Sequence, residues 1–325
     1  MLIIRRPHTN PYFNIAAEEY ILKTFSDDIF MLWQNEPSII VGKHQNTLAE
    51  INYEFVKRNS IPVVRRISGG GTVFHDLGNL NFSFIRKGEK GKLVDFKRFT
   101  TPIVEVLNDI GVPARFEGKN DLRVNGLKIS GNAEHVYKNR VLHHGTLLFS
   151  SDLTFLNKAI KVKEGRFTDK AVKSNRSKVI NILDLLPLPV TIEEFKDKIT
   201  GFIVETEKDA AFYNLSEKDI SGIEKLAEDK YSRWSWNFGY SPKYTLNNTV
   251  EVESGKVEIT VEVHNGIIKN LTISGYGIDV ETSNNLKEIL VGVSHNESSV
   301  EDALNGFQNR DNSGLTAEKL LAGLF

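Results

Sequence analysis

The residues with the clearest chemical potential occupy positions 65–79, with the sequence Arg-Arg-Ile-Ser-Gly-Gly-Gly-Thr-Val-Phe-His-Asp-Leu-Gly-Asn. Glycine has no Cβ and adopts positive φ at low cost, so the N–H groups of three successive glycines can surround an anion such as phosphate. Two arginines precede this turn, and only one can face the anion, because successive strand residues point to opposite faces. The alternative is a tight glycine hairpin with two solvated arginines. The segment is neither a P-loop nor a dinucleotide fingerprint, because it lacks Gly-Lys-Ser/Thr and the spacing Gly-x-Gly-x-x-Gly.

A lysine that could act together with this turn stands at position 128. Residues 120–124 and 127–130 predict two short strands joined by Asn125-Gly126, a pair typical of hairpin turns. Lys128 therefore directly follows the turn. Considered alone, a lysine in such a place is more often exposed and solvated.

Short strands and helices must position both segments. The apolar run 61–64 before the glycines and the alternating run 80–85 after them predict strand, turn and strand. Capping-box patterns open two of the predicted helices. The helices are expected over 10–25, 102–110, 153–160, 191–206 and 216–231. From residue 249, strict alternation predicts an antiparallel meander, and helices near 283–291, 299–307 and 316–324 follow it.

Length and charge suggest two domains. The 325 residues exceed what one hydrophobic core usually serves, and we place the boundary after residue 244. Residues 1–244 carry 36 lysines and arginines against 30 acidic residues, whereas residues 245–325 carry 5 against 12. A basic large domain suits a polyphosphate substrate and an acidic protein partner, although ordinary solubility explains the same numbers.

Several functional classes are disfavoured by what the sequence lacks. There is no cysteine, which excludes disulfides, thiolate metal sites and a cysteine nucleophile. The N-terminal apolar run is too short for a signal peptide, and no run of about 18 apolar residues could span a bilayer. We therefore expect a cytoplasmic protein without a membrane partner. Because no helix-turn-helix pattern is visible and the C-terminal region is acidic, we also expect no nucleic-acid partner.

Taken together, segments 65–79, 120–133 and 143–148 closely resemble the lipoate-protein ligase branch of the biotin and lipoate ligase superfamily. The resemblance extends to 176–181 and 234–239 and covers essentially the whole chain. It implies an α+β fold, with mixed and antiparallel sheets packed with helices in a large catalytic domain. A small α+β C-terminal accessory domain would follow. Biotin is disfavoured as the substrate, because the glycine and lysine segments match the lipoate branch more closely.

The resemblance implies an ATP-dependent lipoate-protein ligase. Lipoate would attack the α-phosphate of ATP, and a lysine of an acceptor protein would then attack the resulting lipoyl-adenylate. Mg2+ would act as an activator, with no prosthetic group and no resident metal site. The implied acceptors are lipoyl domains of 2-oxoacid dehydrogenases and the glycine-cleavage H protein, and octanoate stays open as a second acyl substrate. The alternative is a transferase that uses preformed adenylate or an acyl carrier without ATP. The carrier-dependent transferases use a cysteine, which this chain lacks.

The same resemblance assigns roles to residues. Lys128 matches the catalytic lysine, whose compact ammonium can contact a carboxylate and an α-phosphate together. Arg66 matches a phosphate-binding arginine. The implied ATP- and lipoyl-adenylate-binding residues are Arg66, Ser68, Gly69, Gly70, Gly71, Thr72, Val73, Phe74, His75, Asn79, Asn120, Asp121, Lys128, Ser130 and Gly131.

Some of the neighbouring residues have two open interpretations. Asp121 could bind Mg2+ through water or orient Lys128. His143 and His144 could be catalytic but suit packed polar positions better. The basic loop 161–178 is either a lid over the nucleotide, which we favour, or a solvated loop. An acyl tunnel would need apolar walls, for which we consider Phe74, Phe82, Phe84 and Leu147, although core packing explains these residues equally well.

Overall fold

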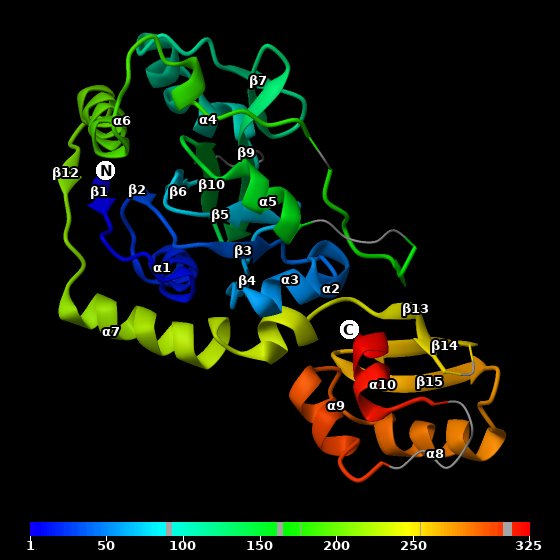
Figure 1. Cartoon of the computed structure of the whole chain (residues 1–325). Helices are drawn as coiled ribbons and strands as arrows, with labels where there is room; N and C mark the ends of the chain where they lie inside the picture. The colour runs from blue at the N-terminus through cyan, green and yellow to red at the C-terminus, as the bar shows by residue number, and fades with distance from the viewer. Residues whose placement is uncertain (89–92, 161–164, 176, 254, 308–313) are drawn as a thin grey trace. The chain divides into compact units, whose positions relative to one another are not determined.

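The computed structural model of the chain describes residues 1–88, 93–160, 165–175, 177–253, 255–307 and 314–325 (Figure 1). Positions 161–164 and 176 of the predicted basic loop thus lie outside the described residues. The chain divides into two compact units. The large unit contains Met1–Lys43, Ser60–Lys158 and Ser174–Arg233. The C-terminal unit contains His44–Asn59, Ala159–Lys173 and Trp234–Phe325.

The large unit is built on an eight-stranded mixed sheet with the strand order β12-β1-β2-β6-β10-β9-β8-β7. β1 runs parallel to β12 and β2, and the remaining neighbours are antiparallel. The strands are β1 (Leu2–Arg5), β2 (Ile29–Trp33), β6 (Asn79–Lys87), β7 (Arg115–Glu117), β8 (Asp121–Val124), β9 (Leu127–Tyr137), β10 (Arg140–Leu148) and β12 (Ala211–Phe212). A separate three-stranded sheet has the order β4-β3-β5 and consists of β3 (Ser38–Val41), β4 (Val63–Arg65) and β5 (Val73–His75).

Side-chain alternation along the central strands separates an apolar face from a polar one. Phe82 and Phe84 of β6 belong to the main hydrophobic core, together with residues of α4 (Phe96–Asp109) and α6 (Ile192–Thr206). Ser83 between them points to the opposite face, where its hydroxyl donates to Glu18 of α1 (Pro11–Thr24). Leu147 also lies in the core, so core packing accounts for these phenylalanines and Leu147.

The helices of the large unit largely follow the predicted positions. Asn10 caps α1 by accepting from the N–H of Phe13 at 3.1 Å, as expected for a helix over 10–25. Both predicted capping boxes are present, at Thr191 and Ser216. The remaining helical segments are α5 (Leu153–Ala159), the 3-10 turn η1 (Leu183–Leu185), α7 (Glu217–Leu226) and the π-helical turn η2 (Ala227–Tyr231).

One helix begins earlier than its sequence predicts. α4 starts at Phe96, whereas a start at Pro102 was expected, because proline suits the first turn of a helix. Asp95 caps the true start by accepting from the N–H of Arg98 at 3.2 Å. Burial of Phe99 and Ile103 in the main core holds both halves of the helix together across the proline.

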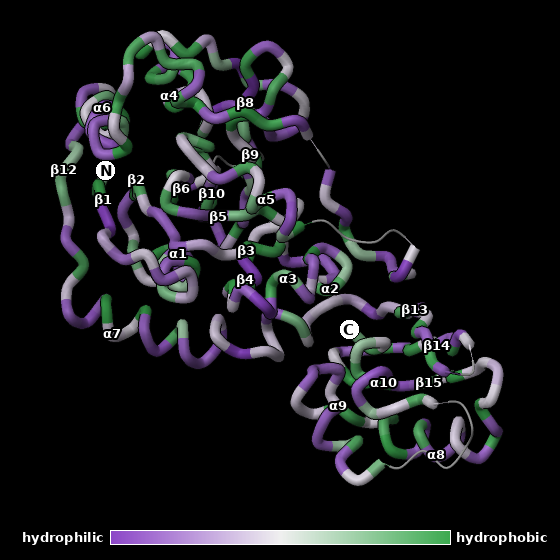
Figure 2. Tube along the Cα trace, viewed as in Figure 1, coloured by the Kyte–Doolittle hydropathy of each residue, from purple (hydrophilic) through white to green (hydrophobic). Residues whose placement is uncertain are grey.

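The C-terminal unit contains an antiparallel sheet with the order β11-β13-β14-β15. Hydrophobic and hydrophilic residues alternate along β14 and β15, as the predicted meander requires (Figure 2). Its strands are β11 (Phe167–Asp169), β13 (Tyr244–Val252), β14 (Gly255–His264) and β15 (Ile267–Gly275). Its helical segments are α2 (Thr47–Glu50), α3 (Tyr53–Arg58), η3 (Ser235–Gly239), α8 (Val280–Leu290), α9 (Glu297–Ala303) and α10 (Ala317–Leu324).

Two short segments that precede residue 174 belong to this C-terminal unit. Leu48 of α2 is buried in its core beside Leu246, and the hydroxyl of Thr47 donates to the carbonyl of Asn237 at 2.6 Å. A single boundary after residue 244 does not separate these segments from the large unit, because sequence order does not show such long-range contacts. The division into residues 1–244 and 245–325 stays a prediction.

The two units together form the predicted α+β architecture, with mixed and antiparallel sheets packed with helices. Among the described residues, no helix has both the length and the apolar sequence that crossing a lipid bilayer requires.

Candidate active site

The three glycines of the turn lie between β4 and β5. These strands do not pair with each other, because both pair with β3, so the turn is not the tight hairpin that the alternative reading supposed. Gly70 has φ +88°, a conformation that favours glycine. A Cβ on Gly69 would meet no atom within 4 Å, so this position faces open space. The turn therefore has room for a ligand beside its backbone.

Neither of the two arginines is solvated. Arg65 is fully buried and donates to the carbonyl oxygens of Gly42 and Lys43 at 3.0 and 3.1 Å. Arg66 is 6% exposed, and its NH2 group donates to the carbonyls of Gly69 and Gly71 at 2.6 and 2.7 Å. Burial lowers the pKa of Arg66 to about 10, against the opposing charge of Glu18, so the guanidinium stays protonated at neutral pH. Arg66 thus holds the two ends of the glycine turn together.

The basic loop also contacts this turn. The N–H of Thr72 donates to Oγ of Ser174 at 2.8 Å. A Cβ on Gly71 would lie 3.0 Å from the same oxygen and 3.2 Å from the Cα of Ser174. A larger residue than glycine would therefore push the loop away from the turn.

Lys128 is held by Asp121 rather than surrounded by water. Its Nζ lies 2.9 Å from Oδ1 of Asp121, and its side chain is 22% exposed. The other carboxylate oxygen, Oδ2, lies 2.6 Å from NH2 of Arg123. A Cβ on Gly131 would lie 2.8 Å from Nζ of Lys128, so the ammonium occupies space that only glycine leaves open. Each oxygen of Asp121 thus faces a cation, and the carboxylate orients Lys128.

The neighbouring polar residues stabilise the β8–β9 hairpin. Nδ2 of Asn120 donates to the carbonyl of Asn132 at 2.6 Å, and Nδ2 of Asn132 donates back to the carbonyl of Asn120 at 3.0 Å. Asn132 also donates to Oγ of Ser130 at 3.2 Å, and the N–H of Gly131 donates to Oγ1 of Thr146 at 3.3 Å. In this arrangement Asn120 and Ser130 stabilise the backbone that presents Lys128.

The glycine turn and the lysine segment meet along β9. A Cβ on Gly70 would lie 4.0 Å from the Cβ of Ala133. Ala133 stands two residues after Gly131, so both face the same side of the strand. The small side chains at positions 131 and 133 therefore let the lysine segment and the glycine turn approach each other on this side of β9.

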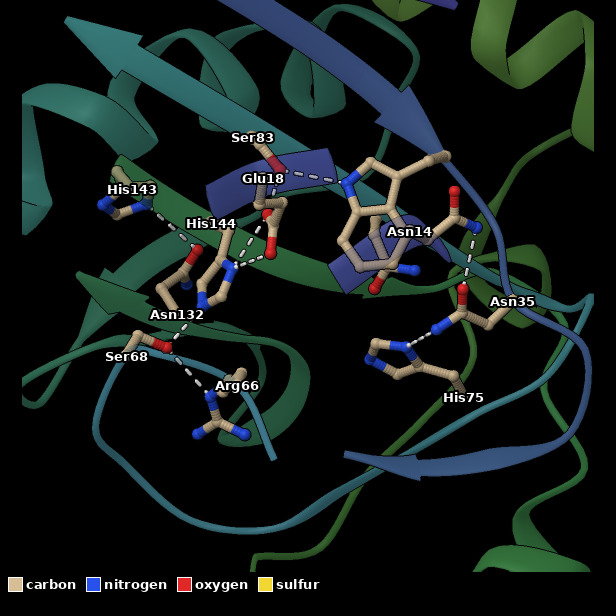
Figure 3. A network of polar contacts seen from close by, with 12 residues as sticks. Asn14, Glu18, Asn35, Arg66, Ser68, His75, Ser83, Asn132, His143 and His144 are labelled. Atoms are coloured by element: carbon tan, nitrogen blue, oxygen red, sulfur yellow. Dashed lines mark hydrogen bonds and ion pairs between the residues drawn. The ribbon is translucent and has the colours of Figure 1, made fainter. Parts of the chain in front are cut away.

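His75 and Asn79 lie in a buried polar region beside the turn (Figure 3 labels His75). Nδ1 of His75 accepts from Nδ2 of Asn35 at 3.1 Å, and Nδ2 of Asn79 donates to Oδ1 of Asn81 at 2.9 Å. Burial, with the charges of Arg66 and His144, lowers the pKa of His75 to about 3, so its imidazole is neutral at physiological pH. Val73 and Phe74 lie on β5, and the Phe74 ring packs against Phe155 with centroids 5.4 Å apart.

Glu18 is the site neighbour that the sequence analysis missed. Its carboxylate accepts from Nδ1 of His144 at 2.9 Å and from the hydroxyl of Ser83 at 2.6 Å. Burial alone would raise the pKa of Glu18, but its interactions with His144, Ser83 and Arg6 outweigh burial and lower it. The sequence carried a signal for Glu18. It stands three residues after Ile15 and three before Ile21, which places it on the buried face of α1, and a buried carboxylate requires polar partners.

The two histidines of β10 are buried and hydrogen-bonded, as the packed-polar interpretation proposed. Nδ1 of His143 lies 2.9 Å from Oε1 of Glu134, and its ring stacks on Phe99 with centroids 5.1 Å apart. Across the described parts of the chain, no three His, Cys, Asp or Glu side chains are grouped so that they could hold a metal ion.

Chemically, the site combines fixed cations with backbone donors. The ammonium of Lys128 lies against Gly131 of β9. The guanidinium of Arg66 lies against the glycine turn, whose Gly70 approaches Ala133 of the same strand. Such an arrangement can reduce the repulsion between two anionic reactants.

Several known proteins are similar to this chain in sequence and in fold. Residues 10–203 match the family described as lipoyl protein ligase A/B catalytic domain, and residues 241–324 match the family described as bacterial lipoate protein ligase C-terminus. The chain is 40% identical over 311 residues to lipoate-protein ligase LplJ of Bacillus subtilis, with 94% of each chain covered.

Two solved structures are similar in fold. One is protein Ta0514, a putative lipoate protein ligase from T. acidophilum with bound lipoic acid, with a TM-score of 0.63 and 28% identity, covering 73% of this chain and 98% of that one. The other is a lipoate-protein ligase A bound with ATP, with a TM-score of 0.62 and 29% identity, covering 74% and 98%. On the strength of these matches over most of its length, the chain belongs to the lipoate-protein ligase family.

Proposed function

We propose that this chain activates lipoate with ATP to form lipoyl-AMP and transfers the lipoyl group to a specific lysine of a lipoyl domain. The observation that carries the proposal is the placement of the Lys128 ammonium and the glycine turn on one side of β9. The relatives bound to lipoic acid and to ATP support the choice of both substrates.

In the first step a lipoate carboxylate oxygen bonds to the α-phosphorus of ATP, the bond from that phosphorus to the bridging oxygen breaks, and pyrophosphate leaves. Two anions meet here, so fixed positive charge lowers the barrier. Lys128, already oriented by Asp121 at 2.9 Å, would contact the carboxylate and the α-phosphate together. Arg66 would keep the glycine turn in shape while the backbone N–H groups of residues 69–71 approach the phosphates.

In the second step the uncharged amine of the acceptor lysine attacks the lipoyl carbonyl carbon. The bond from that carbon to the phosphate oxygen breaks, AMP leaves, and the nitrogen loses a proton as the amide forms. Lys128 would stabilise the negative charge that develops on the carbonyl oxygen and on the departing AMP. The nucleotide and the acyl group would be bordered on the side of β5 by Val73, Phe74, His75 and Asn79.

Mg2+ would enter with the phosphates of ATP, because magnesium is usually bound by substrate phosphates and only one or two carboxylates. It would neutralise charge on the pyrophosphate leaving group. Asp121 is the nearby carboxylate, and both of its oxygens are occupied by cationic side chains. Its proposed role is therefore to position Lys128 rather than to bind the metal.

The acceptors that we propose are lipoyl domains of 2-oxoacid dehydrogenases and the glycine-cleavage H protein, with octanoate as a second acyl substrate and the cytoplasm as the compartment. Residues 1–244 would catalyse both steps, and residues 245–325 would form an accessory domain. The acidic balance of that region and the basic balance of the remainder are compatible with an acidic acceptor docking on the large domain.

Intact-mass measurement tests the proposal directly. The protein is incubated with ATP, Mg2+, lipoate and apo lipoyl domain, and we expect the mass of the domain to increase by one lipoyl group. Lipoate-dependent exchange of labelled pyrophosphate into ATP is expected as well, because the first step is reversible. If exchange is absent while synthetic lipoyl-AMP still modifies the domain, the chain is a transferase and the proposed activation step is wrong.

A further inference from the structure

Four buried side chains form a continuous hydrogen-bonded series that leads from α1 to the glycine turn (Figure 3). The carboxylate of Glu18 accepts from Nδ1 of His144 at 2.9 Å. Nε2 of His144 lies 2.6 Å from Oγ of Ser68, and that oxygen accepts from Nε of Arg66 at 3.0 Å. The series ends at the guanidinium that holds the carbonyls of Gly69 and Gly71.

The partners fix the direction of the hydrogen bonds at both ends of the series. Glu18 also accepts from Ser83, so the carboxylate is an acceptor throughout and the ring proton of His144 is on Nδ1. Oγ of Ser68 accepts from Arg66 and shares a second hydrogen bond with Nε2 of His144. When the imidazole is neutral, every donor from Arg66 to His144 points toward Glu18. This order lets one buried negative charge act on the cation at the far end.

Burial makes the series rigid. Glu18 is 1% exposed and Ser68 is fully buried. Ser83 is held in turn by the indole N–H of Trp33 at 3.0 Å, so Glu18 cannot turn away without breaking two sets of bonds. Hydrogen bonds to a buried carboxylate are stronger than those between neutral groups.

Serine, histidine and glutamate in this order also resemble a nucleophilic triad. Two observations oppose that role. The Ser68 side chain is inaccessible to an acyl carbonyl, and one lone pair of its oxygen accepts from Arg66. A nucleophile needs an open approach to the reacting carbon, whereas this hydroxyl lies in the middle of a series of hydrogen bonds.

We infer that Glu18 is a positioning residue, which acts through His144 and Ser68 to hold Arg66 and the glycine turn in the shape that adenylate formation requires. This inference rests on the proposed function and deepens it. It concerns α1, which contributes no residue to the expected nucleotide-binding set.

The kinetic test uses Glu18→Gln, Ser68→Ala and the double variant in the full chain. In lipoate-dependent pyrophosphate exchange, we expect each single variant to lose about tenfold in kcat, with roughly unchanged KM for lipoate. We expect the double variant to lose no more than about threefold beyond the worse single variant, because both changes interrupt one series. If the fold losses in kcat of the two single variants multiply in the double variant, the inference is overturned.

The neighbouring Glu19→Gln variant is the matched control. Glu19 is also buried on α1, but its carboxylate is bonded by Lys23 and Lys230, both at 2.6 Å, and by Tyr231. We expect this variant to lower the melting temperature without the drop in kcat. An equal drop in kcat would mean that any loss of a buried charge on α1 has this effect, and would overturn the specific role of Glu18.

A second measurement does not depend on activity. Solvent exchange of the Arg66 Nε–H, assigned by its disappearance in Arg66→Lys, is followed by NMR in the parent, Glu18→Gln and Glu19→Gln. We expect Glu18→Gln to speed exchange about tenfold or more, and Glu19→Gln to leave it unchanged. Equal exchange in the parent and Glu18→Gln would overturn the inference. An acyl ester on Ser68 detected by mass would do so as well, in favour of the nucleophile. If the parent shows no pyrophosphate exchange, the proposed function fails while this measurement still decides the role of Glu18.

Discussion

At the scale of single residues, the position of each cation is set by ion pairs and hydrogen bonds that only the folded chain shows. Lys128 is paired with Asp121, seven positions earlier, across the β8–β9 turn. Arg66 donates to four acceptors, among them Ser68 and the carbonyl of Ile40. Side chains fixed in this way lose less freedom when reactants bind, which favours a preorganised site.

Replacing Lys128 by alanine should remove the ammonium that we place against both reactants. By analogy with oxyanion donors, the barrier for adenylate formation should rise by about 3 kcal/mol or more, which is on the order of a hundredfold in rate. Pyrophosphate exchange measures this step. The exposed Lys119 is the control, since Lys119→Ala removes equal charge from the preceding loop. Adenylate formation by Lys128→Ala at the parental rate would contradict the assigned role.

A second residue-scale prediction concerns the space beside that ammonium. Gly131→Ala would place a methyl group 2.8 Å from Nζ and 3.0 Å from Cε of Lys128, so the side chain must move. The φ of Gly131 is not positive, so the backbone should tolerate alanine. We expect kcat to fall by about tenfold with little loss of stability. In the control Gly201→Ala on α6, a Cβ meets no atom within 4 Å, and we expect stability to rise by about 1 kcal/mol with unchanged kcat.

The third residue-scale prediction is a pH dependence in the C-terminal unit. His295 is 1% exposed, accepts from Tyr244 Oη at 2.6 Å and donates to the carbonyl of Leu324 at 2.9 Å, and burial lowers its pKa to about 4. Above about pH 6.5, the usual value for histidine, neither state is protonated and the stabilisation is complete. Between 6.5 and 4 only the unfolded state binds the proton, so stability falls by up to about 1.4 kcal/mol per pH unit.

Urea unfolding at pH 7 and pH 5 checks this dependence. His295→Gln should be less stable than the parent at pH 7, because it loses hydrogen bonds and packing. The difference in the free energy of unfolding between the parent and His295→Gln should narrow by roughly 1 to 2 kcal/mol at pH 5, since glutamine has no proton to gain. The same difference at pH 7 and pH 5 would show that the pKa of His295 is not lowered in the folded state.

At the scale of elements, tertiary burial overrides a local helix signal in α4. Pro102 has no N–H to donate to the carbonyl four residues earlier, yet the helix continues through it from Phe96 to Asp109. Pro102→Ala should therefore raise the free energy of unfolding by about 1 to 2 kcal/mol, because the restored hydrogen bond outweighs the greater freedom of the unfolded chain. Thermal unfolding, with the exposed Thr101→Ala as control, measures the change. A loss of stability would show that the proline fits the helix without strain.

At the scale of the whole molecule, the C-terminal unit depends on segments far away in the sequence. Leu48 is 7% exposed and packs in the core of that unit. Leu48→Ala should reduce stability by about 2 to 4 kcal/mol, since it leaves a cavity in a core that cannot fully collapse. Leu77→Ala, at a side chain that is 53% exposed, should change stability by less than about 0.5 kcal/mol. Calorimetry would decide, and equal melting temperatures for both variants would contradict the placement of Leu48.

Local patterns were enough for most of the elements. The sequence shows directly those features that depend only on neighbouring residues. These are the alternation in β14 and β15, the capping boxes of Thr191 and Ser216, and the Asn125-Gly126 turn between β8 and β9. The start of α4 was wrong, because the burial of Phe99 depends on residues that are distant in sequence. The order of the strands could not be read either, since β4 and β5 pair with β3 and not with each other.

By itself, the sequence determined that this protein combines a glycine turn with a hairpin lysine. The order of these segments resembles that of lipoate-protein ligases and implies an α+β fold. Only the tertiary structure decided that Arg66 and Arg65 are buried, that Asp121 faces two cations, and that Glu18 connects to the turn. The physical reason is that residue types and spacing specify local backbone geometry. Burial and the partners of a charged side chain depend instead on which distant segments pack around it.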